Sequence, residues 1–334
     1  MDINTKKLKK NAYRITRTRG VTALRIRVPG GHLPSSFLPL IQNIAETYGD
    51  GTVHLTARQG FEVPGIAFGA IPEINATIRP LLEMLGVPLD KPDDGYPSAG
   101  ARNISACIGN RVCPYANYDT TALAQRIERE LYPNDLHFKV AVTGCPNDCA
   151  KAQLQDFGVI GKTEPQYDEN RCISCNACAK NCLRRVTGAL SEENFAINRS
   201  HALCIGCGEC VLKCPTGAMT RSETRFFRLV IMGRTGKRQP RLAQTFLDWA
   251  EEDAVVQVIK NTVGFVDKHI DRSLDKEHIG YIVDRTGYPL FRDAVLKGVK
   301  LHPLTRVAEW IDFNGNAYRR DCNLKPAAHW EGTP

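Results

Sequence analysis

Twelve of the thirteen cysteines in this chain fall into two arrays whose spacing suits metal clusters. The later array contains the run C-x2-C-x2-C-x3-C twice, first at Cys172, Cys175, Cys178 and Cys182, then at Cys204, Cys207, Cys210 and Cys214. The earlier array is a C-x5-C pair followed by a C-x3-C pair, at Cys107, Cys113, Cys145 and Cys149. Thiolates at such spacings are typical of iron–sulfur clusters. The sequence therefore indicates a protein that carries electrons.

In each run of the later array, three cysteines can reach one cubane cluster from a tight loop, and the fourth normally ligates the other cluster. We therefore predict one cluster on Cys172, Cys175, Cys178 and Cys214, and a second on Cys204, Cys207, Cys210 and Cys182. Structural zinc is the alternative, but zinc sites favour paired C-x2-C knuckles without the third and fourth cysteines. The second run ends in Cys-Pro as expected, whereas the first continues Cys182-Leu183.

The earlier array could hold a third cubane, either as a further relay cluster or beside another cofactor. Glycine, proline or asparagine flanks each of its pairs, as in the segments 107–114 and 144–149. Loops of this composition allow the backbone to approach a bulky group closely. Spacing alone does not choose between the two uses.

The first 90 residues have the pattern of a small α+β unit. Residues 24–28 and 53–58 alternate apolar and polar side chains, which predicts half-buried strands, the first with an arginine face. Residues 34–48 and 72–85 have helical spacing, and a glycine follows each. Residues 91–100 are rich in Pro, Gly and Asp, which predicts a linker.

The rest of the chain contains a second pattern that a cysteine-rich segment interrupts. We expect a helix over 120–131, strands over 138–142, 157–160 and 225–232, and a long amphipathic helix over 239–260. Residues 164–222 are dense in cysteine and poor in large apolar residues, so they are predicted to be an inserted cluster module. The thirteenth cysteine, Cys322, is predicted to be an unpaired, buried apolar residue.

Composition narrows the class of protein. The net charge is +8, and basic residues crowd positions 1–20, but that stretch lacks the apolar core of a secretory signal. No apolar run is long enough to span a membrane, and no nucleic-acid motif accompanies the basic residues. A reducing cytosol suits cluster cysteines, so we expect a cytoplasmic protein that binds neither membrane nor nucleic acid.

The earlier cysteine array resembles the signature of the sulfite and nitrite reductase family, whose members carry sirohaem coupled to a [4Fe-4S] cluster. Residues 25–31 (RIRVPGG), 55–59 (LTARQ), 143–147 (TGCPN) and 232–241 (MGRTGKRQPR) also resemble family segments. The resemblance covers roughly residues 15–330. It implies an α+β fold with a ferredoxin-like half-domain over 1–90, a sirohaem/[4Fe-4S] reductase domain over 91–163 and 223–334, and an inserted two-cluster ferredoxin domain over 164–222.

The same resemblance implies roles for individual residues. Cys149 would link the third cluster to sirohaem iron. Substrate would be bound by Arg25, Arg102, His137 and Lys139. Sirohaem carboxylates would be held, or the pocket supported, by Arg27, Arg58, Gln59, Arg111, Arg234 and Lys237. The family more often has lysine where this chain has His137, and histidine is a fixed cation only when a neighbouring anion raises its pKa.

In its inserted module and its short length, the chain resembles the catalytic subunits of anaerobic sulfite reductases. The resemblance then implies six-electron reduction of sulfite to sulfide, with sirohaem and three [4Fe-4S] clusters. Because no flavin or nicotinamide motif is visible, electrons would come from flavoprotein and ferredoxin-like partner subunits. A homo-oligomer is also expected. Two alternatives stay open, namely a sirohaem nitrite reductase and a polyferredoxin-type electron carrier without catalytic sirohaem.

Overall fold

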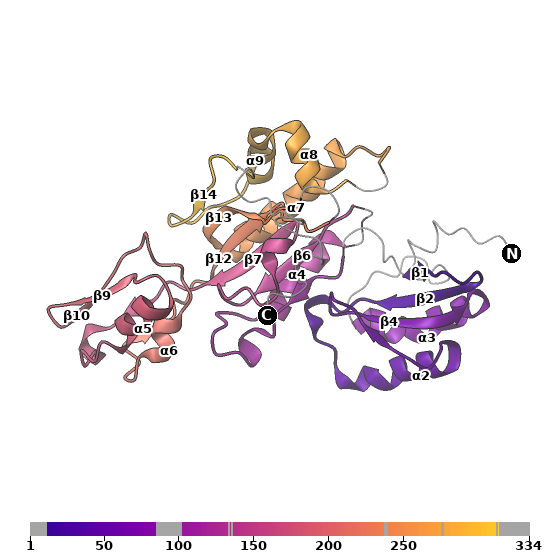
Figure 1. Cartoon of the computed structure of the whole chain (residues 1–334), viewed down its shortest axis with the longest axis horizontal. Helices are drawn as coiled ribbons and strands as arrows, with labels where there is room; N and C mark the ends of the chain where they lie inside the picture. The colour runs from indigo at the N-terminus through magenta and orange to yellow at the C-terminus, as the bar shows by residue number, and fades with distance from the viewer. Residues whose placement is uncertain are drawn as a thin grey trace, which may run out of the picture.

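In the computed structural model of the chain, three units lie in a row along its longest axis (Figure 1). An antiparallel sheet with two helices stands at one end and a cysteine-rich unit at the other, with a larger sheet and its helices between them. The structure describes residues 12–84, 102–132, 134, 136–236, 240–274, 277–311 and 313. Within these ranges, no helix is long and apolar enough to cross a membrane.

The N-terminal unit is a four-stranded antiparallel sheet whose buried residues share one core with two helices. In spatial order its strands are β1 (Tyr13–Ile15), β2 (Val21–Ile26), β4 (Phe61–Ala67) and β3 (His54–Leu55), and its helices are α2 (Leu38–Tyr48) and α3 (Ile71–Met84). Both predicted helices are confirmed, and the two predicted strands overlap β2 and β3, but the strands β1 and β4 were not predicted. Periodicity does not predict β1 or β4, because β1 has only three residues and Pro64 and Gly65 interrupt β4.

The central unit is a six-stranded sheet in which β5, β6 and β7 run parallel and the remaining pairs are antiparallel. The spatial order is β14 (Arg306–Val307), β13 (Gln244–Glu251), β12 (Phe226–Ile231), β7 (Phe157–Lys162), β6 (Val140–Thr143) and β5 (Ser105–Ala106). Its helices are α4 (Thr120–Leu131), α7 (Glu252–His269), α8 (Ile279–Thr286) and α9 (Tyr288–Leu296). Residues of the sheet and these helices form the largest core of the described chain.

One predicted element of this unit is wrong. The long helix expected over 239–260 is instead strand β13 followed by helix α7. Phe246, Leu247 and Ala250 are buried at i, i+1 and i+4, a spacing that also fits a helix face. A strand can bury residues at this spacing because its regular alternation of inward and outward side chains is broken. The pairing of β13 with β12 shifts register, and Trp249 has a positive φ of 57°.

The cysteine-rich unit is inserted between β7 and β12 of the central sheet, and its first and last strands pair with each other. It contains β8 (Gln166–Tyr167) paired with β11 (Met219–Thr220), the hairpin β9 (Leu190–Glu193) and β10 (Ala196–Arg199), and helices α5 (Ala177–Arg185) and α6 (Glu209–Lys213). Six cysteines belong to or pack against its small core.

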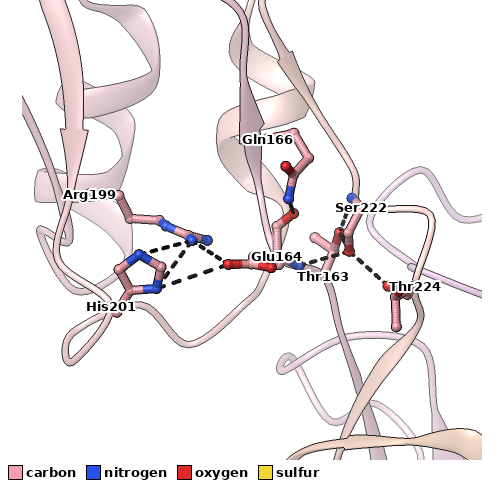
Figure 2. Close-up of polar contacts among 7 residues, drawn as sticks. All are labelled: Thr163, Glu164, Gln166, Arg199, His201, Ser222 and Thr224. Atoms are coloured by element: carbon pink, nitrogen blue, oxygen red, sulfur yellow. Dashed lines mark hydrogen bonds and ion pairs between the residues drawn. The ribbon is translucent and has the colours of Figure 1, made fainter. Parts of the chain in front are cut away.

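Two segments connect this unit to the central sheet, one at residues 163–164 and one at residue 222, and they are hydrogen-bonded to each other (Figure 2). Ser222 N donates to Thr163 Oγ1 at 3.1 Å, and Glu164 N donates to Ser222 Oγ at 3.1 Å. Arg199 Nη2, from β10, donates to Glu164 Oε1 at 2.7 Å. These contacts support the boundaries 164–222, which stay a prediction.

Candidate active site and cluster sites

Five basic residues gather where the N-terminal unit meets the central sheet, and we call them the basic group. They are Arg25, Arg58, Arg102, His137 and Lys139. Arg25 is on β2 and Arg58 lies in the turn between β3 and β4. The other three lie just before β5 or β6, and Arg102 N donates to Phe138 O at 2.8 Å, which brings these segments side by side.

Arg102 is the member of the basic group whose charge lacks a protein partner. Among the described residues, its guanidinium forms no hydrogen bond or ion pair. Burial, and then the positive charges of neighbouring arginines, lower its pKa to about 10. Those neighbours are Arg25, Arg58, Arg14 and Arg27. Burial and nearby positive charges destabilise the charged form of a guanidinium, and a bound anion would stabilise that form.

Arg58 and Arg25 border the same region. Arg58 Nη2 donates to Gln155 Oε1 at 2.6 Å, while its Nη1 is buried and has no hydrogen-bond partner among the described residues. Burial lowers the pKa of Arg58, and the Asp156 carboxylate opposes this. Arg25 donates to Glu62 Oε1 from Nε and Nη2, at 2.7 and 2.6 Å.

Asp156 and His278 are site residues that the sequence did not indicate. The Asp156 carboxylate is 2 % exposed, accepts from Lys139 N at 3.0 Å, and lies 3.1 Å from His278 Nδ1. The His278 ring stands at 89° to the His137 ring, with centroids 4.4 Å apart. His278 immediately precedes α8, so no local motif connects it to residues 137–156.

Two predicted cofactor-binding residues instead join the N-terminal and central units. Arg27 is 2 % exposed and donates to Glu128 Oε1 from Nε and Nη2, at 2.8 and 2.5 Å. Gln59 Nε2 donates to Ala106 O, and Ala106 N donates back to Gln59 Oε1, at 2.6 and 2.8 Å. We therefore propose that Arg27 and Gln59 support the pocket by fixing the two units together.

Two of the remaining predicted carboxylate binders have protein contacts of their own. Arg111 pairs with Asp119, the residue that caps α4, at 3.1 Å. Arg234 is 5 % exposed and stacks on the Tyr281 ring at 3.8 Å. Lys237 and Cys322 lie outside the described residues, as does the predicted linker 91–100. Their roles stay predictions.

The earlier cysteine array gathers at the carboxyl ends of parallel strands. Cys107 directly follows β5, and Cys145 comes two residues after β6. Burial raises the pKa of the Cys145 thiol, and the neighbouring thiols of Cys113, Cys107 and Cys149 add to the rise. Gly144 N donates to Cys107 Sγ at 3.1 Å, and Cys149 is exposed. The four residues predicted for the third cluster are thus neighbours.

The basic group and this cysteine group lie at opposite ends of β5 and β6. Arg102 and Lys139 precede these strands, whereas Cys107 and Cys145 follow them. The four residues of β6 span about 13 Å. The basic and cysteine groups of one copy are therefore separated along these strands by about this length.

The later array also shows the expected neighbours. Burial raises the pKa of Cys178, and Cys214 and Cys175 contribute to the rise. Burial likewise raises the pKa of Cys207 to about 11, and Cys204 and Cys182 are among the groups that contribute. One pocket is lined by all four cysteines predicted for one cluster, Cys182, Cys204, Cys207 and Cys210. In the described residues no group of three His, Cys, Asp or Glu side chains has the spacing of a single-metal site.

These observations fit the groups that the sequence implies. Groups of four neighbouring cysteine thiolates are the usual ligands of [4Fe-4S] clusters. The unpartnered Arg102 and the orphaned Nη1 of Arg58 suit a carboxylate-rich macrocycle or an oxyanion. The role of each residue is still a prediction.

Comparisons with known proteins agree on one family. The family profile described as nitrite and sulphite reductase 4Fe-4S domain matches residues 98–302, and the nitrite/sulfite reductase ferredoxin-like half domain matches residues 14–81. One of the anaerobic sulfite reductase subunits of Salmonella typhimurium is 41 % identical over 325 residues, covering 96 % of each chain. Ferredoxin–nitrite reductase of Synechococcus elongatus is 32 % identical over 42 % of this chain and 26 % of its own.

A solved structure shares the fold of this chain. The crystal structure of dissimilatory sulfite reductase I superposes with a TM-score of 0.63 at 19 % identity, over 90 % of this chain and 76 % of that one. The ferredoxin-like half-domain and the reductase domain expected from the sequence are therefore confirmed. This chain belongs to the nitrite and sulphite reductase family.

Proposed function

We propose that the chain is the catalytic sirohaem subunit of an anaerobic sulfite reductase, which reduces sulfite to hydrogen sulfide. The observation that carries the proposal is the Arg102 guanidinium, half-buried among four arginines with no partner in the described chain. An electron carrier has no need of such a convergence of cations. The 41 % identical relative from an anaerobic sulfite reductase supports sulfite as the anion.

The chemistry of the basic group suits a sulfur oxyanion. Arg102 offers a planar fork that can donate two parallel hydrogen bonds to an oxyanion, and Arg25 adds positive charge beside it. In a partly desolvated pocket these bonds stabilise negative charge more strongly than water would. The Arg25 side chain is held in direction by Glu62, because Nε and Nη2 both donate to Glu62 Oε1.

The cysteine group and part of the basic group would hold the cofactors. We propose that Cys107, Cys113, Cys145 and Cys149 bind a [4Fe-4S] cluster, with Cys149 shared with sirohaem iron, and that Arg58 contacts a sirohaem carboxylate. Sirohaem when bound supplies the iron centre at which the oxyanion is reduced, and the clusters supply its electrons.

Asp156, His278 and His137 are arranged to hold protons near the anion. The Asp156 carboxylate accepts from His278 Nδ1, so the other ring nitrogen of His278 is left to exchange protons. The His137 ring packs against His278 and is part of the basic group. We propose that His137 donates protons to the bound anion and that His278 orients and recharges it.

The opposite placement of the basic and cysteine groups leads us to propose a homo-oligomer. In it, the basic group of one copy faces Cys149 of another copy across a shared sirohaem. Each group then stays at its observed strand end, and one anion can lie between them. The proposed partners in electron supply are a flavoprotein and a ferredoxin-like protein.

We further propose that the cysteine-rich unit is a two-cluster ferredoxin module. Two cysteine neighbourhoods, one around Cys178 and one around Cys207, each contain a cysteine from the other run, as the predicted ligand sets require. We propose that Cys214 ligates the cluster of Cys178 and that Cys182 ligates the cluster of Cys207. Iron and acid-labile sulfide analysis of anaerobically purified protein tests the count of three clusters.

An absorption spectrum and an activity assay on the same sample test the function. We expect the Soret and long-wavelength bands of sirohaem, and sulfide production with reduced viologen as donor. Clusters without sirohaem bands would instead establish a polyferredoxin. Nitrite turnover with a higher kcat/KM than sulfite turnover would establish a nitrite reductase.

A further inference from the structure

One loop of the cysteine-rich unit is pressed against the central unit. A side chain at Gly206 would put its Cβ 2.9 Å from Lys162 Cβ and from the Trp249 ring. The φ of Gly206 is +71°, a conformation that side-chain-bearing residues rarely adopt. Thr163 N also donates to Gly206 O at 2.9 Å. The loop between Cys204 and Cys207 therefore lies directly on the end of β7 and on β13.

The same loop reaches the segment that follows Cys113. At Gly208 a Cβ would lie 2.9 Å from Asn117 Oδ1 and 3.6 Å from Arg221 Nε. Arg221 Nε donates to Asn117 Oδ1 at 3.0 Å, and Arg221 Nη2 donates to Pro114 O at 2.8 Å. Pro114 is the next residue after Cys113. Arg221 thus joins the loop of one cluster set to the loop of another.

The other cysteine loop, residues 172–178, is hydrogen-bonded within its own unit. Arg171 Nη2 donates to Thr216 O at 3.0 Å, and Ser174 Oγ donates to Phe195 O at 2.8 Å. In the part of the chain that the structure describes, no hydrogen bond or ion pair of residues 172–178 reaches the central unit. Cys175 is exposed.

A buried cation lies beneath the docked loop. The Lys162 side chain is 1 % exposed, and its Nζ donates to Asp248 Oδ1 at 2.6 Å and lies 3.7 Å from the Trp249 ring centroid. Burial lowers the pKa of Lys162 to about 8, and the Asp248 carboxylate and, more weakly, Cys204 oppose this. Arg228 Nε donates to the same Asp248 oxygen at 3.1 Å, so this carboxylate has a second cationic partner.

We propose that the cluster of the Cys204 run is the inner cluster of the module, that electrons pass from it to the Cys113 loop, and that Lys162 raises its reduction potential. This inference rests on the proposed two-cluster module. Each transfer moves one electron: a reduced ferredoxin-type partner reduces the outer cluster, held by the Cys172 run, which reduces the inner one. Reduction adds one negative charge to a cluster, and a buried ammonium nearby stabilises that charge. The inner cluster is then the better acceptor, and flow is directed inward.

Redox titration of the anaerobic holoprotein, followed by electron paramagnetic resonance, tests the proposal. Lys162→Met should lower the midpoint potential of one module cluster by about 59 mV. For a one-electron couple, this shift makes the ratio of reduced to oxidised cluster about tenfold lower at a fixed solution potential. Lys162→Arg should restore most of the shift because it keeps the charge. Arg228→Met is the matched control, because it removes a cation from Asp248 without uncovering the loop, and it should change the potential less.

Two cysteine variants identify the affected cluster. Cys207→Ser should lack the paramagnetic resonance signal that Lys162→Met shifts, and Cys175→Ser should keep that signal. If Lys162→Met instead shifts the signal that is missing from Cys175→Ser, the proposed order of the two clusters is reversed. Unchanged potentials in Lys162→Met would refute the role of Lys162. The sirohaem bands and viologen-driven sulfide production of the same samples separate these outcomes from failure of the proposed function. Sirohaem with fewer than two module clusters in the wild type would refute the module itself.

Discussion

The ring of His278 stands perpendicular to the ring of His137, with 4.4 Å between their centroids. Asp156 holds His278 in this orientation through Nδ1, and the same carboxylate accepts the backbone N–H of Lys139. One buried carboxylate therefore positions a histidine from the region before α8 and the segment that precedes β6. In the proposed function, this arrangement would supply protons to the basic group from a fixed position.

Replacing His278 should slow proton supply and leave anion binding intact. We expect His278→Phe, which keeps a ring against His137, to lower kcat for sulfite about tenfold or more, because general acid catalysis contributes at least this much. KM should stay near the wild-type value. His302→Phe is a control, since His302 packs on Phe226 elsewhere. A wild-type kcat for His278→Phe would rule out the relay.

Arg102 should act on the anion and not on folding. Arg102→Ala should reduce kcat/KM for sulfite by about tenfold to a hundredfold, because a hydrogen bond from a charged group contributes about 1.5–3 kcal/mol. Lys139→Ala should have an effect of the same order. Sirohaem absorbance should persist in both variants, and the exposed Arg79→Ala should behave as wild type. Normal steady-state kinetics of Arg102→Ala would mean that the anion binds elsewhere.

Complementation between copies tests the shared site. Arg102→Ala and Cys149→Ser should each have little activity alone, because each lacks one half of every site. When they are co-expressed with different affinity tags, a symmetric dimer should regain about a quarter of wild-type activity, since half of the dimers contain one intact site. Activity that stays at the level of the single variants would show that one copy supplies both groups.

The Arg27–Glu128 pair should matter for stability. Glu128→Gln leaves the Arg27 guanidinium, 2 % exposed, without its carboxylate, and breaking a buried pair in this way costs about 3–5 kcal/mol. We expect the temperature at which circular dichroism is lost to fall by about 5 °C or more. Burial raises the pKa of Glu128 against the opposing charge of Arg27.

The matched control for this pair is exposed. Glu83→Gln breaks the Arg79–Glu83 pair on α3, whose side chains are 45 % and 62 % exposed, and such pairs contribute about 0–1 kcal/mol. Equal melting temperatures for Glu128→Gln and Glu83→Gln would show that the buried pair does not stabilise the joint between the two units.

The strand β13 shows why part of the fold could not be predicted from the sequence. Phe246, Leu247 and Ala250 repeat at helical spacing, so periodicity predicts a helix there. The segment becomes a strand because its backbone pairs with β12, which is a long-range contact. Irregular pairing then places apolar residues inward at positions that simple alternation does not give. The helix at 120–131, in contrast, was predictable, because Asp119 caps it locally.

The sequence by itself determined the cysteine chemistry and the family, because cluster ligands lie within a few residues of one another and their spacing reflects local loop geometry. It also indicated the basic residues that precede β5 and β6. Only the tertiary structure decided that Asp156 meets His278, 122 residues away, and that Arg27 is used in a joint between units. It also decided that the basic and cysteine groups occupy opposite strand ends. These relations depend on which strands pair and which faces are buried, and such long-range packing is not expressed in the spacing of neighbouring residues.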